Sequence, residues 1–344
     1  MIERTDRMAL VYKGSPPNHT CCDQALRILP DGTWVVVFMT GGVREPEVDN
    51  HVVLCRSTDY GMTWGKPEVV LQYPDRGATL SEVMVLDGRL ILMAQTHDGY
   101  FGQWRVWSLE SADGGSTWSE PEPFSPCPRR SFVRNLYRAS WGTWYLPMQS
   151  YPVVDDVDAS PLRDGSHRLA ENWVLRSDDE GQTWTPSERI GPMAGWAENN
   201  LVELSDGRLI MLVRGDGTGC LWRSESLDRG ASWTPWVSTE IPNPGSKFRL
   251  FRLGDGRIAL VHNPNPATRH PNSKPAAQCN RNPLALWISD DDMRTWGYQR
   301  DLVRFPGMLA YPDGVLDEDS GYIHLAFDYN RHDVIYWGAA LPAP

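Results

Sequence analysis

The chain has 344 residues, of which 41% are hydrophobic, and its formal net charge is −11 at pH 7. This composition is that of a globular protein, and the sequence has no run of about 18 apolar residues that could cross a bilayer. Because phosphate binding requires clustered Lys and Arg, an acidic chain without a basic run argues against nucleic acid as a partner.

The N-terminal segment MIERTDRMALVYKG has neither an apolar region nor the small-residue cleavage site of a secretory signal. We therefore expect a cytoplasmic protein, with a mature secreted form as the alternative. The six cysteines include no C-x-x-C pair, and the eight histidines show no H-x-x-H or H-E-x-x-H spacing. We expect no bound metal and no cofactor, and the sequence does not indicate an oligomeric state.

One short pattern, S-x-D-x-G-x-T/S-W, occurs five times, at residues 57–64, 111–118, 177–184, 226–233 and 289–296. Each copy fits a hairpin turn in which Asp accepts hydrogen bonds from its own turn and Gly adopts a positive φ. The fifth copy has Met293 in place of this Gly. The Trp that ends each copy is expected to be largely buried between neighbouring sheets.

A second set of turns alternates with the first between apolar, β-branched runs. These turns are Asp31-Gly32, Asp87-Gly88, Gly142, Asp206-Gly207, Asp255-Gly256 and Ser320-Gly321, about 50 to 65 residues apart. The two sets together predict an all-β fold, a six-bladed β-propeller of four-stranded antiparallel blades. The last blade has no copy of the pattern, and we expect a strand around residues 8–12 to complete it. No linker divides the chain, so residues 1–344 are expected to form one domain.

Hairpin geometry also predicts which side chains meet at one mouth of the central channel. Residues equally distant from a turn are neighbours, and the innermost strand of each blade lines the channel. The pairs brought to the same end of a hairpin are Glu198 with Arg214, Arg249 with His262, and Glu82 with His97. The loops that open at that end contain Arg44, Glu45, Asp49, Glu171, Asn172 and Arg281.

With five copies of the pattern, which is known as the Asp box or BNR repeat, nearly the whole chain resembles the sialidase superfamily. The Asp box is specific for this fold and says little about activity, because a fold does not determine function. Members of the superfamily use a Tyr nucleophile assisted by a Glu, an Asp as acid/base, and three arginines that bind the carboxylate of the substrate.

The resemblance implies roles for individual residues. The stretch AENNLVELSDGRLIMLVR is similar to the segment that runs from the Glu to the second arginine, which implies these roles for Glu198 and Arg214. The stretch RNPLALWISDDDMRTW resembles the segment that begins with the third arginine, here Arg281. Tyr311, in MLAYPDGV, resembles the nucleophile, which opens the inner strand of the last blade.

The acid/base residue falls at Asp49, eight residues before the first Asp box, with Glu45 as the close alternative. The first arginine belongs to an Arg-Ile-Pro signature, but that place here reads Cys22-Asp23-Gln24. Asp23 would repel a carboxylate, so ordinary sialic acid is not the expected substrate unless Arg44 supplies the missing charge. The further candidates for substrate binding are Asp23, Arg44, Arg249, His97 and His262.

Three functions are consistent with this mouth, and all imply a glycan or oligosaccharide partner. The first is a sialidase-like, exo-acting glycoside hydrolase that removes a terminal sugar, either acidic or neutral. The second is a polysaccharide lyase, in which Arg neutralises a uronate and Tyr or His abstracts its C5 proton. The third is a non-catalytic propeller that binds carbohydrate or protein. A lyase product absorbs in the ultraviolet, which separates the first two.

Overall fold

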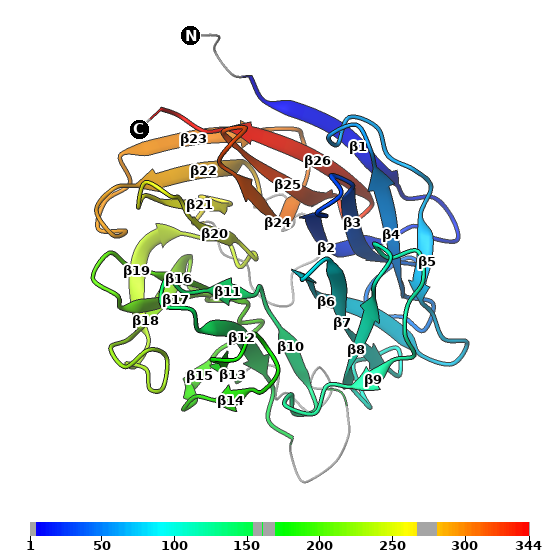
Figure 1. Ribbon diagram of the computed structural model, residues 1–344, viewed down its shortest axis with the longest axis horizontal. Helices are drawn as coiled ribbons and strands as arrows, with labels where there is room; N and C mark the ends of the chain where they lie inside the picture. The colour runs from blue at the N-terminus through cyan, green and yellow to red at the C-terminus, as the bar shows by residue number, and fades with distance from the viewer. Residues whose placement is uncertain (1–4, 154–159, 161–168, 267–280, 344) are drawn as a thin grey trace.

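A computed structural model of the chain describes residues 5–153, 160, 169–266 and 281–343. Within these residues the secondary structure consists of β-strands without an α-helix, and the strands form six antiparallel sheets around one axis (Figure 1). The predicted six-bladed β-propeller is therefore confirmed. In the same part of the chain we find no helix of the length and apolarity that a membrane span requires.

The first three blades follow one another along the chain. The first consists of β2 (Cys21–Ile28), β3 (Trp34–Thr40), β4 (His51–Ser57) and β5 (Glu68–Leu71). The second consists of β6 (Gly77–Leu86), β7 (Arg89–His97), β8 (Arg105–Ser111) and β9 (Glu122–Pro123). The third contains β10 (Ser131–Val133), β12 (Trp144–Ser150), β13 (Ala170–Ser177) and β14 (Thr185–Pro186), with β11 (Tyr137–Arg138) and β15 (Ile190–Met193) paired beside them.

The remaining blades complete the ring. The fourth consists of β16 (Asn199–Glu203), β17 (Leu209–Arg214), β18 (Cys220–Ser226) and β19 (Val237–Pro242). The fifth consists of β20 (Arg249–Arg252), β21 (Ile258–His262), β22 (Leu284–Ser289) and β23 (Tyr298–Val303). The sixth combines β24 (Leu309–Asp317), β25 (Tyr322–Tyr329) and β26 (Asp333–Ala340) with β1 (Arg7–Lys13).

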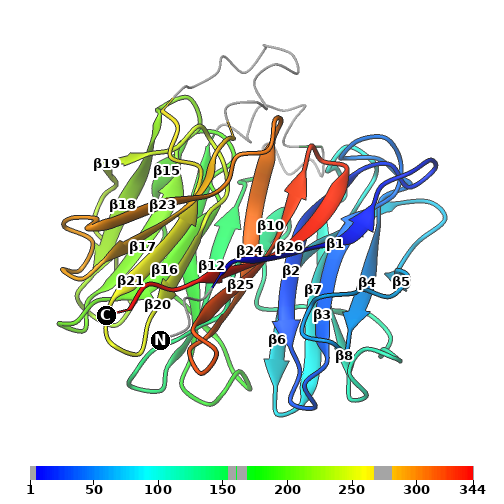
Figure 2. The same cartoon turned by 90° about the horizontal axis from the view of Figure 1, so that it is seen from above.

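The ring is closed by the N-terminal strand. β1 pairs antiparallel with β26, so the first strand of the chain is the outermost strand of the last blade, as predicted (Figures 1 and 2). The sixth and first blades pack through an apolar cluster that includes Leu26, Phe38 and Tyr336, all fully buried. Burial of a side chain of this size stabilises the fold by about 1.5 to 3 kcal/mol, which favours closure.

The Asp-box turns have the hydrogen bonds expected from their sequence. In the first box the N–H of Gly61 donates to Ser57 Oγ at 2.9 Å, and the hydroxyl and N–H of Thr63 donate to Asp59. These bonds lower the pKa of Asp59 to about 2. Met293, in the fifth box, keeps the same turn, because its N–H donates to Ser289 Oγ at 2.9 Å and its φ is +62°.

The box tryptophans are less buried than expected. Trp64, Trp118, Trp184, Trp233 and Trp296 are each only partly buried. The indole N–H of Trp64 donates to the carbonyl of Gly61 in its own turn, and the ring packs 6.2 Å from that of Tyr336. Since the turn lies at the end of the blade, one side of the indole packs on the sheet while the other remains accessible to solvent.

The innermost strands all run in the same direction, which gives the channel two different ends (Figure 2). We call the end where these strands begin the strand-start mouth, and the opposite end, where the hairpin turns lie, the turn mouth. Between them lies a polar belt with one residue from each blade. It consists of Arg27, Glu82, Asn135, Asn200, Arg249 and Asp313, all of them buried except Arg249, which is partly buried. Arg27 joins Glu82 at 2.5 Å and Asp313 at 2.6 Å.

Candidate active site

The strand-start mouth holds a cavity of about 180 Å³. Its walls come from several blades and are formed by Asp23, Glu45, Pro46, Phe101, Phe132, Arg134, Trp196, Glu198, Tyr311 and Arg331. A larger hollow of about 990 Å³ lies at the turn mouth. Of the residues predicted at the site, Glu82 and Arg249 line the hollow, whereas Asp23, Glu45, Glu198 and Tyr311 line the smaller cavity.

Tyr311 lies at the start of β24 in an unfavourable backbone conformation. Its φ is +59°, in the left-handed region that non-glycine residues rarely adopt, and such strain costs about 1 to 3 kcal/mol. The pairing of β24 with β25 shifts register between Ala310 and Asp313, and β2 has a similar shift between Cys22 and Ala25. The side-chain amide of Gln24, fully buried, donates to the carbonyls of Ala310 and Tyr311. Gln24 therefore holds the strained segment that presents Tyr311 to the cavity.

Arg214 connects Tyr311 to Glu198. Its Nη1 lies 2.8 and 2.9 Å from the two carboxylate oxygens of Glu198 and 3.2 Å from Tyr311 Oη, and its Nε contacts Asp216 at 2.5 Å. Burial by itself would raise the pKa of Glu198, but Arg214, Arg134 and Arg281 outweigh it and keep the pKa below its usual value. Glu198 is therefore a carboxylate at neutral pH.

The phenol of Tyr311 is neutral in this setting. Burial raises its pKa, and the negative charge of Glu198 raises it further, although nearby arginines oppose this. The guanidinium carbons of Arg281 and Arg331 lie 5.0 and 4.9 Å from the ring centroid, and Lys247 Nζ lies 6.0 Å away. Cations at these distances attract the face of the ring, and they would also stabilise a phenolate. The arrangement suits a phenol that gives its proton to Glu198 as it reacts.

Glu45, on the loop between β3 and β4, is the acid that reaches the cavity. Its Oε2 accepts a hydrogen bond from Cys22 Sγ at 3.2 Å and pairs with Arg331 Nη2 at 3.1 Å. Burial raises the pKa of Glu45, with Arg331 opposing this effect. Asp49 is exposed and does not line the cavity. The loop is held by Asn50, whose side chain bonds the carbonyls at residues 41 and 44 and the N–H at residue 47.

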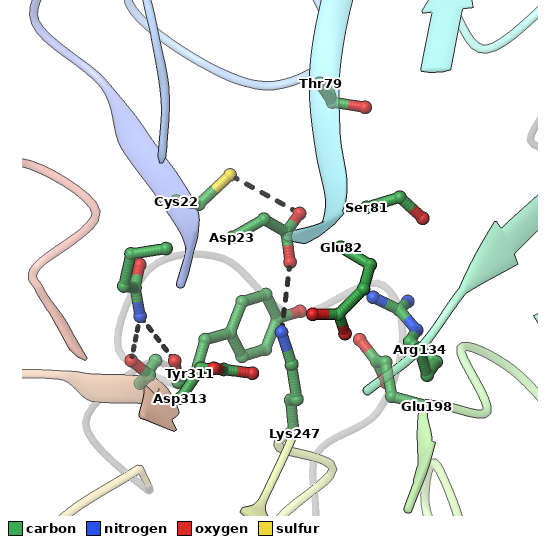
Figure 3. A network of polar contacts seen from close by, with 12 residues as sticks. Cys22, Asp23, Thr79, Ser81, Glu82, Arg134, Glu198, Lys247, Tyr311 and Asp313 are labelled. Atoms are coloured by element: carbon green, nitrogen blue, oxygen red, sulfur yellow. Dashed lines mark hydrogen bonds and ion pairs between the residues drawn. The ribbon is translucent and has the colours of Figure 1, made fainter. Parts of the chain in front are cut away.

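Asp23 lies in the wall of the cavity, where the resemblance would place an arginine. Its Oδ1 is 3.9 Å from Lys247 Nζ, and Figure 3 shows this pair beside the ring of Tyr311. The structure does not bring Arg44 to this position, because its side chain is 67% exposed and pairs with Glu47 at 3.1 Å. The missing arginine charge is therefore not restored from the neighbouring loop.

Comparison with known proteins agrees with this fold. The profile of the BNR repeat-like domain family matches residues 32–325, which is most of the chain. The chain belongs to this family. A sialidase of Clostridium perfringens is 27% identical, over 90% of this chain and 84% of the relative. A sialidase of Paraclostridium sordellii is 29% identical, over 91% and 80%. The Hadza microbial sialidase superposes with a TM-score of 0.73 at 17% identity, over 94% of this chain and 66% of that one. These relatives place the BNR-repeat chain in the sialidase superfamily.

Two residues predicted on the fifth blade of this BNR-repeat protein do not reach the cavity. Arg249 extends into the polar belt, where its Nη1 lies 3.2 Å from Asn200 Oδ1, and it lines the hollow at the turn mouth. His262 is fully buried with its ring 4.6 Å from that of Trp287, and burial lowers its pKa to about 3. Counting residues from the hairpin turn assigned both residues to the correct strands. It did not show which way each side chain points, because alternate side chains of a strand point to opposite faces.

His97 also lies outside the cavity. Its register partner is Gly77, whereas Glu82 pairs with Met93, because Glu82 stands only five residues before Asp87 while His97 stands nine residues after Gly88. Glu82 thus belongs to the polar belt rather than to the strand-start mouth. The ring of His97 accepts the N–H of Gly99 at 3.0 Å, and burial lowers the pKa of His97 to about 4, so it is a neutral, packed residue.

Sequence reasoning missed three cations of the site, namely Arg134, Lys247 and Arg331. Arg134 stands eight residues before Gly142, just as Glu198 stands eight before Asp206, so the hairpin count applied to the third blade would have found it. Arg331 lies in the turn between β25 and β26, and Lys247 lies just before β20. We find no signal in the sequence for these two.

One group of potential metal ligands occurs among the described residues. Ligand atoms of Cys22, Asp23 and Glu45 lie within 4.8 Å of one another. Arg331 and Lys247 already balance the two carboxylates, so the charges of this group are compensated by ion pairs within the protein.

Proposed function

We propose that this protein is a sialidase-like, exo-acting glycoside hydrolase that removes a terminal sugar from a glycan. The observation that carries the proposal is the cluster in which Arg214 contacts both Tyr311 and Glu198, with Glu45 in the same cavity. A small cavity at the end of the channel suits the end of a glycan rather than its interior. The sialidases among the relatives support this class of reaction.

The first chemical step uses all three groups. Tyr311 Oη attacks the anomeric carbon while the phenol proton passes to Glu198, which is ionised and ready to accept it. Glu45, whose pKa is raised by burial, donates a proton to the departing glycosidic oxygen. The products are a sugar bonded to Tyr311 and the free remainder of the glycan.

The second step returns the protein to its starting state. Glu45, now a carboxylate, removes a proton from water, and the resulting hydroxyl attacks the anomeric carbon. The bond to Tyr311 breaks, and the phenolate, which faces Arg281 and Arg331, regains its proton from Glu198. Two successive displacements retain the configuration of the sugar.

The substrate is proposed to be a sugar other than ordinary sialic acid. Asp23, which pairs with Lys247, stands where the resemblance leads us to expect the first arginine. A charge-assisted hydrogen bond is worth about 1.5 to 3 kcal/mol, so its loss weakens transition-state binding roughly tenfold to a hundredfold before any repulsion from Asp23.

A panel of fluorogenic glycosides that differ in the terminal sugar tests the proposal. Wild-type protein should release the fluorophore from at least one of them without forming an ultraviolet-absorbing, unsaturated sugar. Glu198→Gln should lower kcat/KM at least roughly a hundredfold, because general base catalysis is lost. The matched control is Glu188→Gln, at an exposed position. An unsaturated product would instead show a lyase, and an unaffected Glu198→Gln variant would contradict the mechanism.

A further inference from the structure

The cations around Tyr311 and Glu198 differ in how they are compensated. Three of them have a carboxylate partner: Arg214 with Glu198 and Asp216, Lys247 with Asp23, and Arg331 with Glu45. The other two are Arg134 and Arg281. In the described part of the chain, no ion pair joins either of these to a carboxylate, although both favour the charged form of Glu198 across the cavity.

Arg134 is held firmly, yet one of its nitrogens is unused. Its Nε and Nη2 both donate to Gln149 Oε1, and its guanidinium lies over the ring of Phe132, 4.4 Å from the centroid. Its Nη1 is buried and has no hydrogen-bond partner among the residues that the structure describes, while Arg134, 3% exposed, lines the cavity. An unpartnered guanidinium nitrogen in such a place is costly unless a ligand supplies the acceptor.

Arg281 is the second of these two cations. Its Nη2 donates to the carbonyl of Gly245 at 2.9 Å, and its guanidinium carbon lies 5.0 Å from the centroid of the Tyr311 ring. Arg134 comes from the third blade and Arg281 from a loop of the fifth, with Glu198 of the fourth blade between them. Asp23, on the first blade, lines the cavity too, but its charge is compensated by Lys247. A negative group of a ligand is therefore attracted toward Arg134 and Arg281, on the third and fifth blades, rather than toward the first blade.

The wall next to Arg134 is aromatic. Phe101, Phe132 and Trp196 line the cavity, with ring centroids 5.7 Å apart for Phe101 and Trp196 and 6.5 Å apart for Phe132 and Trp196. An apolar wall of this kind excludes water and strengthens the attraction between a guanidinium and an anion. It also offers a flat surface to the apolar face of a sugar ring.

We propose that Arg134 is a specificity-determining residue, which together with Arg281 binds the single carboxylate of a terminal hexuronic acid. The inference rests on the proposed function only in treating the cavity as a sugar site. Planar guanidinium groups match a carboxylate in geometry, which favours this group over a hydroxyl. In this arrangement the carboxylate of the ligand binds beside Arg134 on the third blade and not beside Asp23 on the first.

Binding measured without turnover tests the inference separately from the proposed hydrolysis. The protein used is Tyr311→Phe, and isothermal titration calorimetry compares D-glucuronate, D-galacturonate, D-mannuronate and L-iduronate with the neutral hexose of the same configuration. At least one uronate should bind tenfold or more tightly than its neutral hexose. Adding Arg134→Gln should abolish this preference while binding of the neutral hexose is unchanged.

Two further variants make the outcome decisive. Arg138→Gln removes an exposed arginine nearby and should leave the preference intact. Arg134→Lys keeps the charge, so a weaker preference for the uronate should remain even if Arg134→Gln fails to fold. The proposal is overturned if no uronate binds more tightly than its hexose, or if either Arg134 variant weakens acidic and neutral sugars equally.

Discussion

Replacing Arg27 with Gln is expected to destabilise the protein far more than any exposed charge substitution. Arg27 is buried and is joined to two buried carboxylates, Glu82 at 2.5 Å and Asp313 at 2.6 Å. Breaking one buried ion pair costs about 3 to 5 kcal/mol, because the remaining charge stays buried without its partner. Since Arg27→Gln leaves two carboxylates, we expect the loss to lie at the upper end of that range.

Urea unfolding at pH 7 and pH 5 measures this loss. Burial would raise the pKa of Asp313, but Arg27 and Arg249 outweigh it and the pKa is lowered in the folded protein. The stability from this shift is present above the ordinary Asp pKa and is lost as the pH falls through the folded value. Without Arg27 the pKa of Asp313 should rise, so the deficit of the variant should shrink at lower pH.

A matched control separates this effect from a general loss of charge. Arg89 pairs with Glu110 at 2.9 Å, but both side chains are about half exposed. Arg89→Gln should therefore change the free energy of unfolding by less than about 1 kcal/mol. If Arg27→Gln were no more destabilising than this control, or if its deficit grew at lower pH, the view of the polar belt as a buried ion-pair network would be refuted.

Three other expectations concern the strand-start mouth. Glu45→Gln should remove the fall of kcat/KM at high pH, because wild-type activity is lost as Glu45 deprotonates at its raised pKa; an unchanged pH profile would argue against Glu45 as the acid. Gln24→Leu should lower kcat with little change in KM, since the strained backbone of Tyr311 loses its support. Steady-state kinetics in which KM rises and kcat is unchanged would contradict this expectation. Arg44→Ala should leave kcat/KM within about twofold, because Arg44 is exposed and pairs with Glu47, and a collapse of activity would show that the loop closes over the substrate.

Regular strand geometry made part of the site predictable from sequence. The hairpin around Asp206-Gly207 pairs Asn199 with Val213, so Glu198 and Arg214 must lie side by side at its end. The same reasoning gave the closing strand β1 and the ring of six blades. It worked because these positions depend only on the distance from a turn and on the two-residue period of a strand.

The remaining positions depend on local irregularity. The register shift between Leu80 and Glu82 places His97 opposite Gly77 instead of Ala78, and Glu82, only five residues before Asp87, pairs with Met93 rather than reaching the end of the hairpin. The sequence favoured Asp49 over Glu45 because the spacing to the first Asp box does not reveal the hydrogen bonds of Asn50, which hold this loop in its observed shape. Arg331 reaches the site from the turn between β25 and β26, where it contacts Glu45, and no sequence periodicity encodes a contact between residues so distant in the chain.

The central claim is that Tyr311 is the nucleophile of a glycosidase. Its most direct test is kcat/KM for Tyr311→Phe on the best glycoside of the panel, beside Tyr329→Phe, which removes a hydroxyl bonded to the carbonyl of Pro306 outside the cavity. We predict that Tyr311→Phe loses activity by roughly a thousandfold or more while Tyr329→Phe retains it. Equal activity of Tyr311→Phe and wild-type protein would contradict the account.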